Sequence, residues 1–244
     1  MKKKQIDARS LGLKLATNVA LCTLVCSIGA LCLSPMNESV YTETNSVKPY
    51  RFAEENAVGV SLMFNVYWGT DEVYRILDIL AKNEAKATFF IGGCWADDNA
   101  EGLKAIATAG HELGNHGYFH KDHPSLTLDG NIKEISNCNQ FIELAVGRIP
   151  TLFAPPSGAY NDTTLQAANG LNMTTILWSK DTIDWRDKNA ALIYTRATKN
   201  VKKGDFILMH PMSATADALT DILKYYRANN LETITVSENL HLEG

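Results

Sequence analysis

Two histidines four residues apart, His116 and His120, are the residues whose type and spacing most directly allow chemistry. Side chains at positions i and i+4 of a helical turn lie on one face, so both imidazoles could reach a single metal ion. The chain has only six histidines in 244 residues, so two of them are not expected to stand four residues apart by chance. The other interpretation is that both are solvated loop histidines, and the spacing alone does not decide between the two.

Short apolar runs and amphipathic segments alternate along the chain after residue 57. The apolar runs predict strands at 58–64, 87–91, 111–115, 151–154, 174–178, 205–209 and 233–236. The amphipathic segments predict helices at 71–82, 98–109, 129–146, 161–169, 188–200 and 214–228. Strand and helix alternating about seven times predict an α/β fold with a parallel sheet, most simply a closed or nearly closed barrel.

Several polar residues and prolines directly follow these predicted strands. In a βα barrel the residues after the strands meet at one end, where active sites are built. We therefore expect them to converge on one pocket. They are Asn65, His116, Pro155, Pro156, Asp181, Asp184 and His210.

Composition sets modest limits on the function. A chain of this length with 45% hydrophobic residues can bury one large core as a single domain. Its net charge of −4 is too small to indicate a partner, and no basic, aromatic-rich tract predicts nucleic-acid binding. We expect Cys94 and Cys138 to be unpaired, with a disulfide between them as the alternative.

The N-terminus has the features of a membrane anchor. Five basic residues in the first 14 precede an uncharged run at 15–33, close to the ~20 residues that cross a bilayer. The basic flank should stay in the cytoplasm. We predict a single-pass cell-membrane protein with a cytoplasmic flank and signal anchor at 1–34, an exposed stalk at 35–56 and an extracellular domain at 57–244. A cleaved signal peptide, which would leave a secreted protein, is the alternative.

Motifs at 86–91, 110–116, 155–160, 178–181, 184–185 and 204–210 resemble, in order, those of the NodB-homology domain of polysaccharide deacetylases, carbohydrate esterase family 4. The resemblance covers about three quarters of the chain. It implies a distorted (β/α)7 barrel that removes acetyl groups from N-acetylated sugars of peptidoglycan or chitin. Cell-wall glycan would be the partner, and we expect a monomer.

The resemblance also implies catalytic roles for individual residues. His116 and His120 would be ligands of a divalent metal, with zinc expected. His210 would be the general acid that protonates the leaving amine, and Asp184 would pair with it and favour its protonated form. The alternative for His210 is a capped strand end without chemistry.

Four further residues would shape the sugar groove: Pro155, Pro156, Tyr160 and Trp185. Flat apolar faces suit pyranose rings, so Tyr160 and Trp185 would form the walls. Core packing is the alternative for Trp185.

The first motif departs from the family pattern. Family members carry Phe-Asp-Asp-Gly after the first strand, with the first Asp as base and the second as metal ligand. Here Phe64 is followed by Asn65, which cannot take a proton from water, and by Val66, which cannot bind a metal. Ala154 replaces the family's Arg that pairs with the base. A partly buried Arg without its carboxylate partner would destabilise the fold by about 3–5 kcal/mol. The loss of the Arg is therefore expected to accompany the loss of the Asp.

Two hypotheses about function follow from these departures. Catalytic zinc sites usually have three protein ligands, so we expect weak binding or none, unless Tyr67, Asp71 or Glu72 substitutes. One hypothesis is a cell-wall deacetylase of low or specialised activity. The other is an inactive pseudoenzyme that binds glycan or a partner protein. Some sporulation-associated deacetylase-like proteins have a similar degenerate first motif.

Overall fold

The computed structural model describes residues 48–54 and 56–242, whose central element is the strand β1 (Gly59–Val66). All eight of its residues are buried, as expected for a parallel strand covered on both faces. The parallel sheet has the strand order β5-β4-β3-β2-β1-β7-β6, and β8 pairs with the first residues of β1. The other strands are β2 (Thr88–Ile91), β3 (Glu112–Asn115), β4 (Leu152–Phe153), β5 (Thr174–Thr175), β6 (Lys180–Asp181), β7 (Phe206–Met209) and β8 (Glu232–Thr233).

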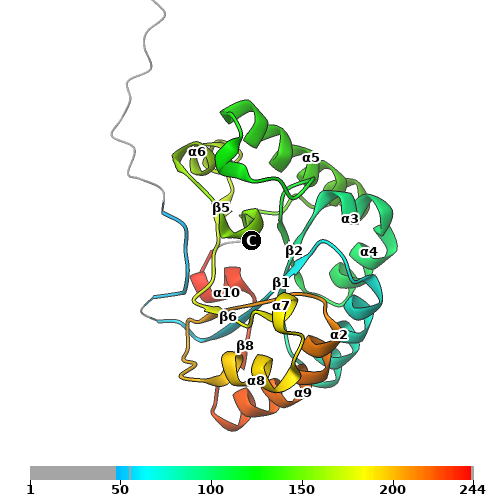
Figure 1. Ribbon diagram of the computed structural model, residues 1–244, viewed down its shortest axis with the longest axis vertical. Coiled ribbons are helices and arrows are strands. Elements are labelled where there is room, and N and C mark those ends of the chain that lie inside the picture. Colours follow the sequence, from blue (N-terminus) through cyan, green and yellow to red (C-terminus); the bar gives the residue numbers. More distant parts are fainter. Residues whose placement is uncertain (1–47, 55, 243–244) are drawn as a thin grey trace, which may run out of the picture. The chain divides into compact units, whose positions relative to one another are not determined.

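The longer helices lie around the outer side of this sheet (Figure 1). The helix α2 buries the apolar face that the sequence pattern predicts. A threonine cap at Thr127 begins α5, and Gly147 at a left-handed φ of 72° ends it. The helices are α2 (Thr70–Lys82), α3 (Gly93–Asp98), α4 (Ala100–Thr108), α5 (Leu128–Val146), α6 (Asp162–Gly170), α7 (Asp184–Asp187), α8 (Ala190–Thr198), α9 (Ser213–Ala228) and α10 (Val236–Leu240).

The expectation of a closed or nearly closed barrel is met only in part, because the parallel sheet is an open half-barrel. Its edge strands β5 and β6 do not pair with each other in the described part of the chain. Only residues 176–179 join them, which leaves no room for a crossover helix. Residues 50–53, here called the N-terminal strap, lie between the two edges. Tyr50 N donates to Thr175 O at 3.0 Å, and Ala53 N donates to Gly204 O at 2.8 Å.

The two faces of β1 have different surroundings because successive side chains point to opposite sides. Phe64 and Val66 belong to the apolar cluster shared with α2 and α9. Met63 belongs to an interior cluster with Phe90 and Ala154. Asn65, two residues after Met63, is therefore on the interior side of the half-barrel.

The short helix α10 covers the end of the half-barrel where the strands begin, opposite their C-terminal ends. Its Asn239 Nδ2 donates to Gly59 O at 3.0 Å, and Val236 N donates to Thr88 Oγ1 at 2.9 Å. Gly59 and Thr88 begin their strands, so α10 closes the N-terminal end of the sheet and leaves its C-terminal end open to solvent.

The predicted anchor at 15–33 and most of the predicted stalk lie outside the described residues. None of the helices within the described ranges is long and apolar enough to cross a membrane. Both cysteines of the described chain, Cys94 and Cys138, are free, as expected.

Candidate active site

A pocket of about 300 Å³ lies where the predicted site residues converge. Of those residues, Asn65, His116, His120, Asp181, Trp185 and His210 all line it. Its other lining residues are Trp68, Ser157, Trp178 and Leu208. The residues that follow separate strands thus meet at one end of the sheet, as the sequence predicts.

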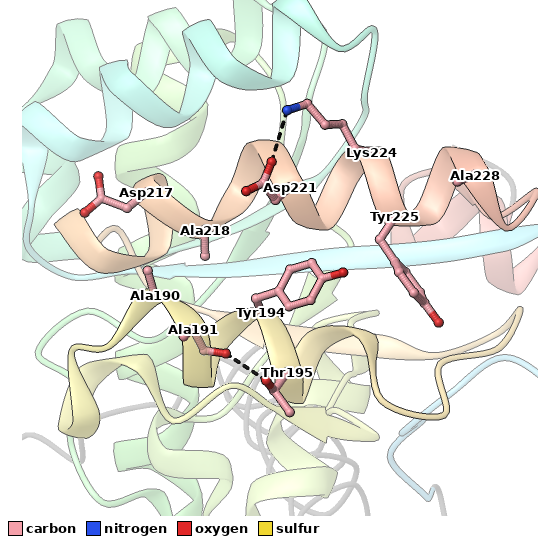
Figure 2. Close-up of a pocket in the computed structure, with 10 residues that line it drawn as sticks. All are labelled: Ala190, Ala191, Tyr194, Thr195, Asp217, Ala218, Asp221, Lys224, Tyr225 and Ala228. Atoms are coloured by element: carbon pink, nitrogen blue, oxygen red, sulfur yellow. Dashed lines mark hydrogen bonds and ion pairs between the residues drawn. The ribbon is translucent and has the colours of Figure 1, made fainter.

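A larger groove of about 660 Å³ lies between α8 and α9 and contains none of the predicted site residues (Figure 2). Its carboxylates have partners of opposite charge: Asp217 pairs with Arg75, and Asp221 pairs with Lys224 at 3.0 Å. Figure 2 shows Tyr194 on the side of α8 that faces α9, and Asp221 joined to Lys224 on α9. The chemistry predicted from sequence therefore belongs to the smaller pocket.

His116 is buried and held in one orientation. Its Nδ1 lies 2.7 Å from Ala154 O. A carbonyl oxygen can only accept, so Nδ1 carries the proton and Nε2 keeps a free lone pair. Burial, reinforced by the neighbouring His120, lowers the pKa of His116 to about 3. The imidazole is therefore neutral at physiological pH and able to accept a hydrogen bond or bind a cation.

His120 reaches His116 through a loop, and not through the helical turn that the spacing predicts. The two ring centroids are 5.1 Å apart and edge to face, while His120 has a left-handed φ of 53°. Asn115 Oδ1 accepts from Gly117 N at 2.7 Å. The buried Glu134 on α5 accepts from Phe119 N at 2.8 Å. Sequence reasoning missed Asn115 and Glu134, which shape this loop.

His210 and Asp184 form a hydrogen-bonded pair. His210 Nδ1 lies 2.8 Å from Asp184 Oδ1. The carboxylate is fully buried and also accepts from His210 N at 2.6 Å, Thr215 Oγ1 at 2.6 Å and Trp185 N at 2.8 Å. The pairing expected from sequence is present, and Thr215 is a further member that sequence reasoning missed. His210 keeps Nε2 available on the pocket side of the pair.

The opposite half of the pocket has no carboxylate at the positions where the resembling family has two. Asn65 is 3% exposed, and its Oδ1 has no hydrogen-bond partner among the described residues. Val66 is fully buried in the outer apolar cluster and does not line the pocket. Ala154 is fully buried in the interior cluster.

Comparison with known proteins identifies the family of this chain. A sequence profile described as polysaccharide deacetylase matches residues 53–176. A peptidoglycan-N-acetylglucosamine deacetylase of Bacillus cereus is 34% identical over 181 residues, which are 70% of this chain and 84% of that protein. The chain belongs to the polysaccharide deacetylase family.

Two further relatives of this polysaccharide deacetylase family member lack an assigned activity or have lost it. The uncharacterized protein YlxY of Bacillus subtilis is 34% identical over 85% of this chain, which spans only 65% of that protein's length. A CE4 family pseudoenzyme from Bacillus anthracis is 34% identical, with a TM-score of 0.78 over 81% of this chain and 70% of that one. A mutant of that pseudoenzyme with restored enzymatic activity has the same TM-score at 32% identity.

The donor set of this deacetylase-family pocket does not fit a three-ligand catalytic zinc site. Within the described residues, no group of three or more His, Cys, Asp or Glu side chains is placed to hold a metal ion. Asp71 and Glu72 lie in the first turn of α2 and do not line the pocket. The ring of Tyr67 packs on His120 at 4.8 Å, and burial raises the pKa of Tyr67, which keeps its hydroxyl neutral. Two imidazoles and the Asn65 amide oxygen remain.

Aromatic side chains form much of the pocket wall. Trp68 is 42% exposed, and its ring lies parallel to the His210 imidazole with centroids 5.8 Å apart. Trp185 is 49% exposed and lines the pocket as expected. Trp68, Trp178 and Ser157 were not predicted as wall residues. Three expected groove residues do not line the pocket: Pro155 and Pro156 are buried, and Tyr160 is half-buried.

Proposed function

We propose that this protein binds N-acetylated cell-wall glycan in the pocket and does not turn it over at an appreciable rate. One observation carries the proposal: Asn65 lines the pocket at the base position, and among the described residues no carboxylate joins His116 and His120 in a group that could hold a metal ion. Support also comes from the relatives, among which are a peptidoglycan deacetylase and a pseudoenzyme of similar fold.

Amide hydrolysis needs a group that takes a proton from the attacking water. The Asn65 amide has no basic lone pair for this role. His116 has a free Nε2, but a group with a pKa of about 3 is a poor base near neutral pH. Neither Asn65 nor His116 is therefore an effective base for the attacking water.

The same groups suit the binding of an intact sugar. His116 Nε2 and Asn65 Oδ1 are acceptors without partners among the described residues, and sugar hydroxyls are donors. The exposed faces of Trp68 and Trp185 offer flat apolar surfaces to a pyranose ring. Apolar walls with a few polar groups are typical of a small-ligand site.

Slow metal-dependent deacetylation is the second candidate. His116 and His120 lie close enough to share a cation, and the His210–Asp184 pair is complete. If a metal is held there, it would supply a polarised water, and His210 would protonate the leaving amine.

Binding and acetate release, measured on one set of proteins, separate the two candidates. We expect wild type to bind N-acetylglucosamine tetramer by calorimetry, and Trp185→Ala to weaken that binding. Acetate release from the tetramer and from peptidoglycan should not exceed that of His210→Ala, with or without added zinc. Acetate release by wild type that His210→Ala abolishes would establish the enzyme and overturn the proposal.

Rebuilding the missing half provides the positive control. The variant Asn65→Asp, Val66→Asp, Ala154→Arg puts back the two carboxylates and the Arg of the family pattern, and the new carboxylate at position 66 would have to turn from the outer apolar cluster towards the pocket. General-base catalysis typically contributes about 10²–10⁴-fold to the rate. The zinc-loaded variant should therefore release acetate much faster than wild type does. His210→Ala in this background should remove most of the gain.

We further propose that residues 15–33 hold the protein in the cell membrane, with the glycan-binding domain on the outer side. The basic flank and the uncharged run support this placement. Cell-wall glycan lies on the same side of the membrane as the proposed binding pocket.

A further inference from the structure

We infer that the pocket selects uncharged N-acetylglucosamine units and disfavours sugars that carry a carboxylate, such as N-acetylmuramic acid with a free lactyl group. This inference rests on the proposed glycan binding and specifies its ligand. Asp181 and Trp68 would be the residues that determine the specificity.

The first observation is the charge of the pocket lining. Asp181 lines the pocket, and no lysine or arginine is among the described residues that do so. Its Oδ1 accepts from Ile183 N at 2.8 Å, which fixes the carboxylate in place. The nearby Arg186 is engaged by Asp187 at 2.7 Å and 3.2 Å. An incoming carboxylate would meet a like charge without a compensating cation.

The histidines of the lining do not reverse this charge. His116 directs its Nδ1 proton to Ala154 O, 2.7 Å away, and so does not offer that proton to a ligand. A proton on His210 would be balanced by the Asp184 carboxylate 2.8 Å away. The pocket is thus neutral to negative, which favours a ligand that presents hydroxyl and amide groups only.

The second observation is that the aromatic wall is held in place before any ligand arrives. Trp68 Nε1 donates to Met212 Sδ at 3.3 Å, and its ring stacks on His210. Gly69 has a φ of 79°, and a Cβ there would lie 2.3 Å from Pro211 O. The β1–α2 loop therefore sits directly against the β7–α9 loop, which fixes the Trp68 face that would contact the sugar.

The cavity volume of about 300 Å³ is at the lower end of the range for small-molecule sites. A single sugar unit is the ligand that this volume suits. Volume alone would also disfavour the lactyl group, so charge and size must be separated by experiment. Asp181→Asn removes the charge and keeps the size.

The groove between α8 and α9 supplies matched controls outside the pocket (Figure 2). Asp221→Asn makes the same charge change as Asp181→Asn. Tyr194→Ala removes an aromatic ring, as Trp68→Ala does. Neither control residue lines the pocket.

Calorimetry with two peptide-free probes tests the inference: N-acetylglucosamine tetramer, and a tetrasaccharide of alternating N-acetylglucosamine and N-acetylmuramic acid with free lactyl groups. Wild type should bind the neutral probe at least about tenfold more tightly at low salt. High salt should narrow this ratio, because salt screens charges near the surface. Asp181→Asn should strengthen binding of the acidic probe about tenfold relative to the neutral probe. Trp68→Ala should weaken both, and the two controls should change neither.

Each result that differs from these expectations overturns one stated claim. Equal or tighter binding of the acidic probe by wild type overturns the preference and leaves the proposed function standing. An Asp181→Asn variant that is folded by circular dichroism and still rejects the acidic probe overturns the role of Asp181. Failure of wild type to bind either probe overturns the proposed function, and this inference with it.

Discussion

Replacing Asp184 by Asn should cost far more stability than so conservative a change usually does. Each carboxylate oxygen accepts one bond from a backbone N–H: Oδ1 from Trp185 N and Oδ2 from His210 N. The other two donors are His210 Nδ1 and Thr215 Oγ1. An asparagine has one oxygen and one NH2 group, so its NH2 must face a backbone N–H in either orientation.

The magnitude follows from that clash of donors. Thr215 can rotate its hydroxyl and His210 can change its tautomer, but a backbone N–H can only donate. One buried donor therefore loses its partner, at about 1–3 kcal/mol, and bonds to a charged acceptor worth about 1.5–3 kcal/mol each become neutral. We expect Asp184→Asn to lower the free energy of unfolding by about 3–5 kcal/mol.

Urea denaturation followed by tryptophan fluorescence measures the effect. Thr215→Val removes one donor to the carboxylate and should cost about 1.5–3 kcal/mol, less than Asp184→Asn. An Asp184→Asn protein within about 1 kcal/mol of wild type would refute the reasoning that this carboxylate organises the loop ends. If the large loss is found, structural need alone accounts for the complete His210–Asp184 pair, and its presence does not imply turnover.

Three further predictions concern position 66, acid stability and the N-terminus. Val66→Asp buries a carboxyl group in an apolar cluster, so without zinc it should lose about 3 kcal/mol or more of unfolding free energy, and zinc should restore part of it. Its zinc affinity, measured with a chelator dye, should exceed that of wild type by about tenfold, and equal affinities would contradict the assignment of position 66 as the missing ligand. Burial and Lys86 lower the pKa of His111 to about 4, so its neutral form stabilises the fold above about pH 6.5, and about 1–2 kcal/mol should be lost between pH 7.5 and 5. The urea midpoint of wild type should fall between these pH values, and that of His111→Leu should fall less. An identical pH dependence of the two midpoints would rule out His111 as the source of the loss. N-terminal sequencing should find residues 15–33 in the mature protein, and a start after residue 29 would show cleavage.

The elements and the convergence of the site could be predicted from sequence because they depend on local patterns. The helix at 71–82 was evident from Val73, Ile76, Leu77 and Leu80 on one face, and these residues are buried in α2. The site residues follow separate strands, and parallel strands bring their ends together whatever the details of the barrel.

What the sequence did not reveal depends on contacts between distant segments. The His116–His120 loop takes its shape from Glu134, which has no periodic signal of its own. The helix predicted at 98–109 is α4, and a short helix that was not predicted, α3, precedes it; the chain turns between the two at Asn99. The strand predicted at 233–236 ends early because Thr235 and Glu238 form a capping box that begins α10. The open side of the sheet depends on where residues 50–53 pair, which no local pattern indicates.

The N-terminal strap has a consequence for how the isolated domain would behave. A chain starting at residue 57, the boundary that the sequence predicts, would keep every residue that lines the pocket. It would lose the backbone bonds from residues 50–53 to Thr175, Leu177 and Gly204. Unpaired strand edges are templates for another chain. A shortened protein of this kind would tend to self-associate through its sheet, with its pocket intact.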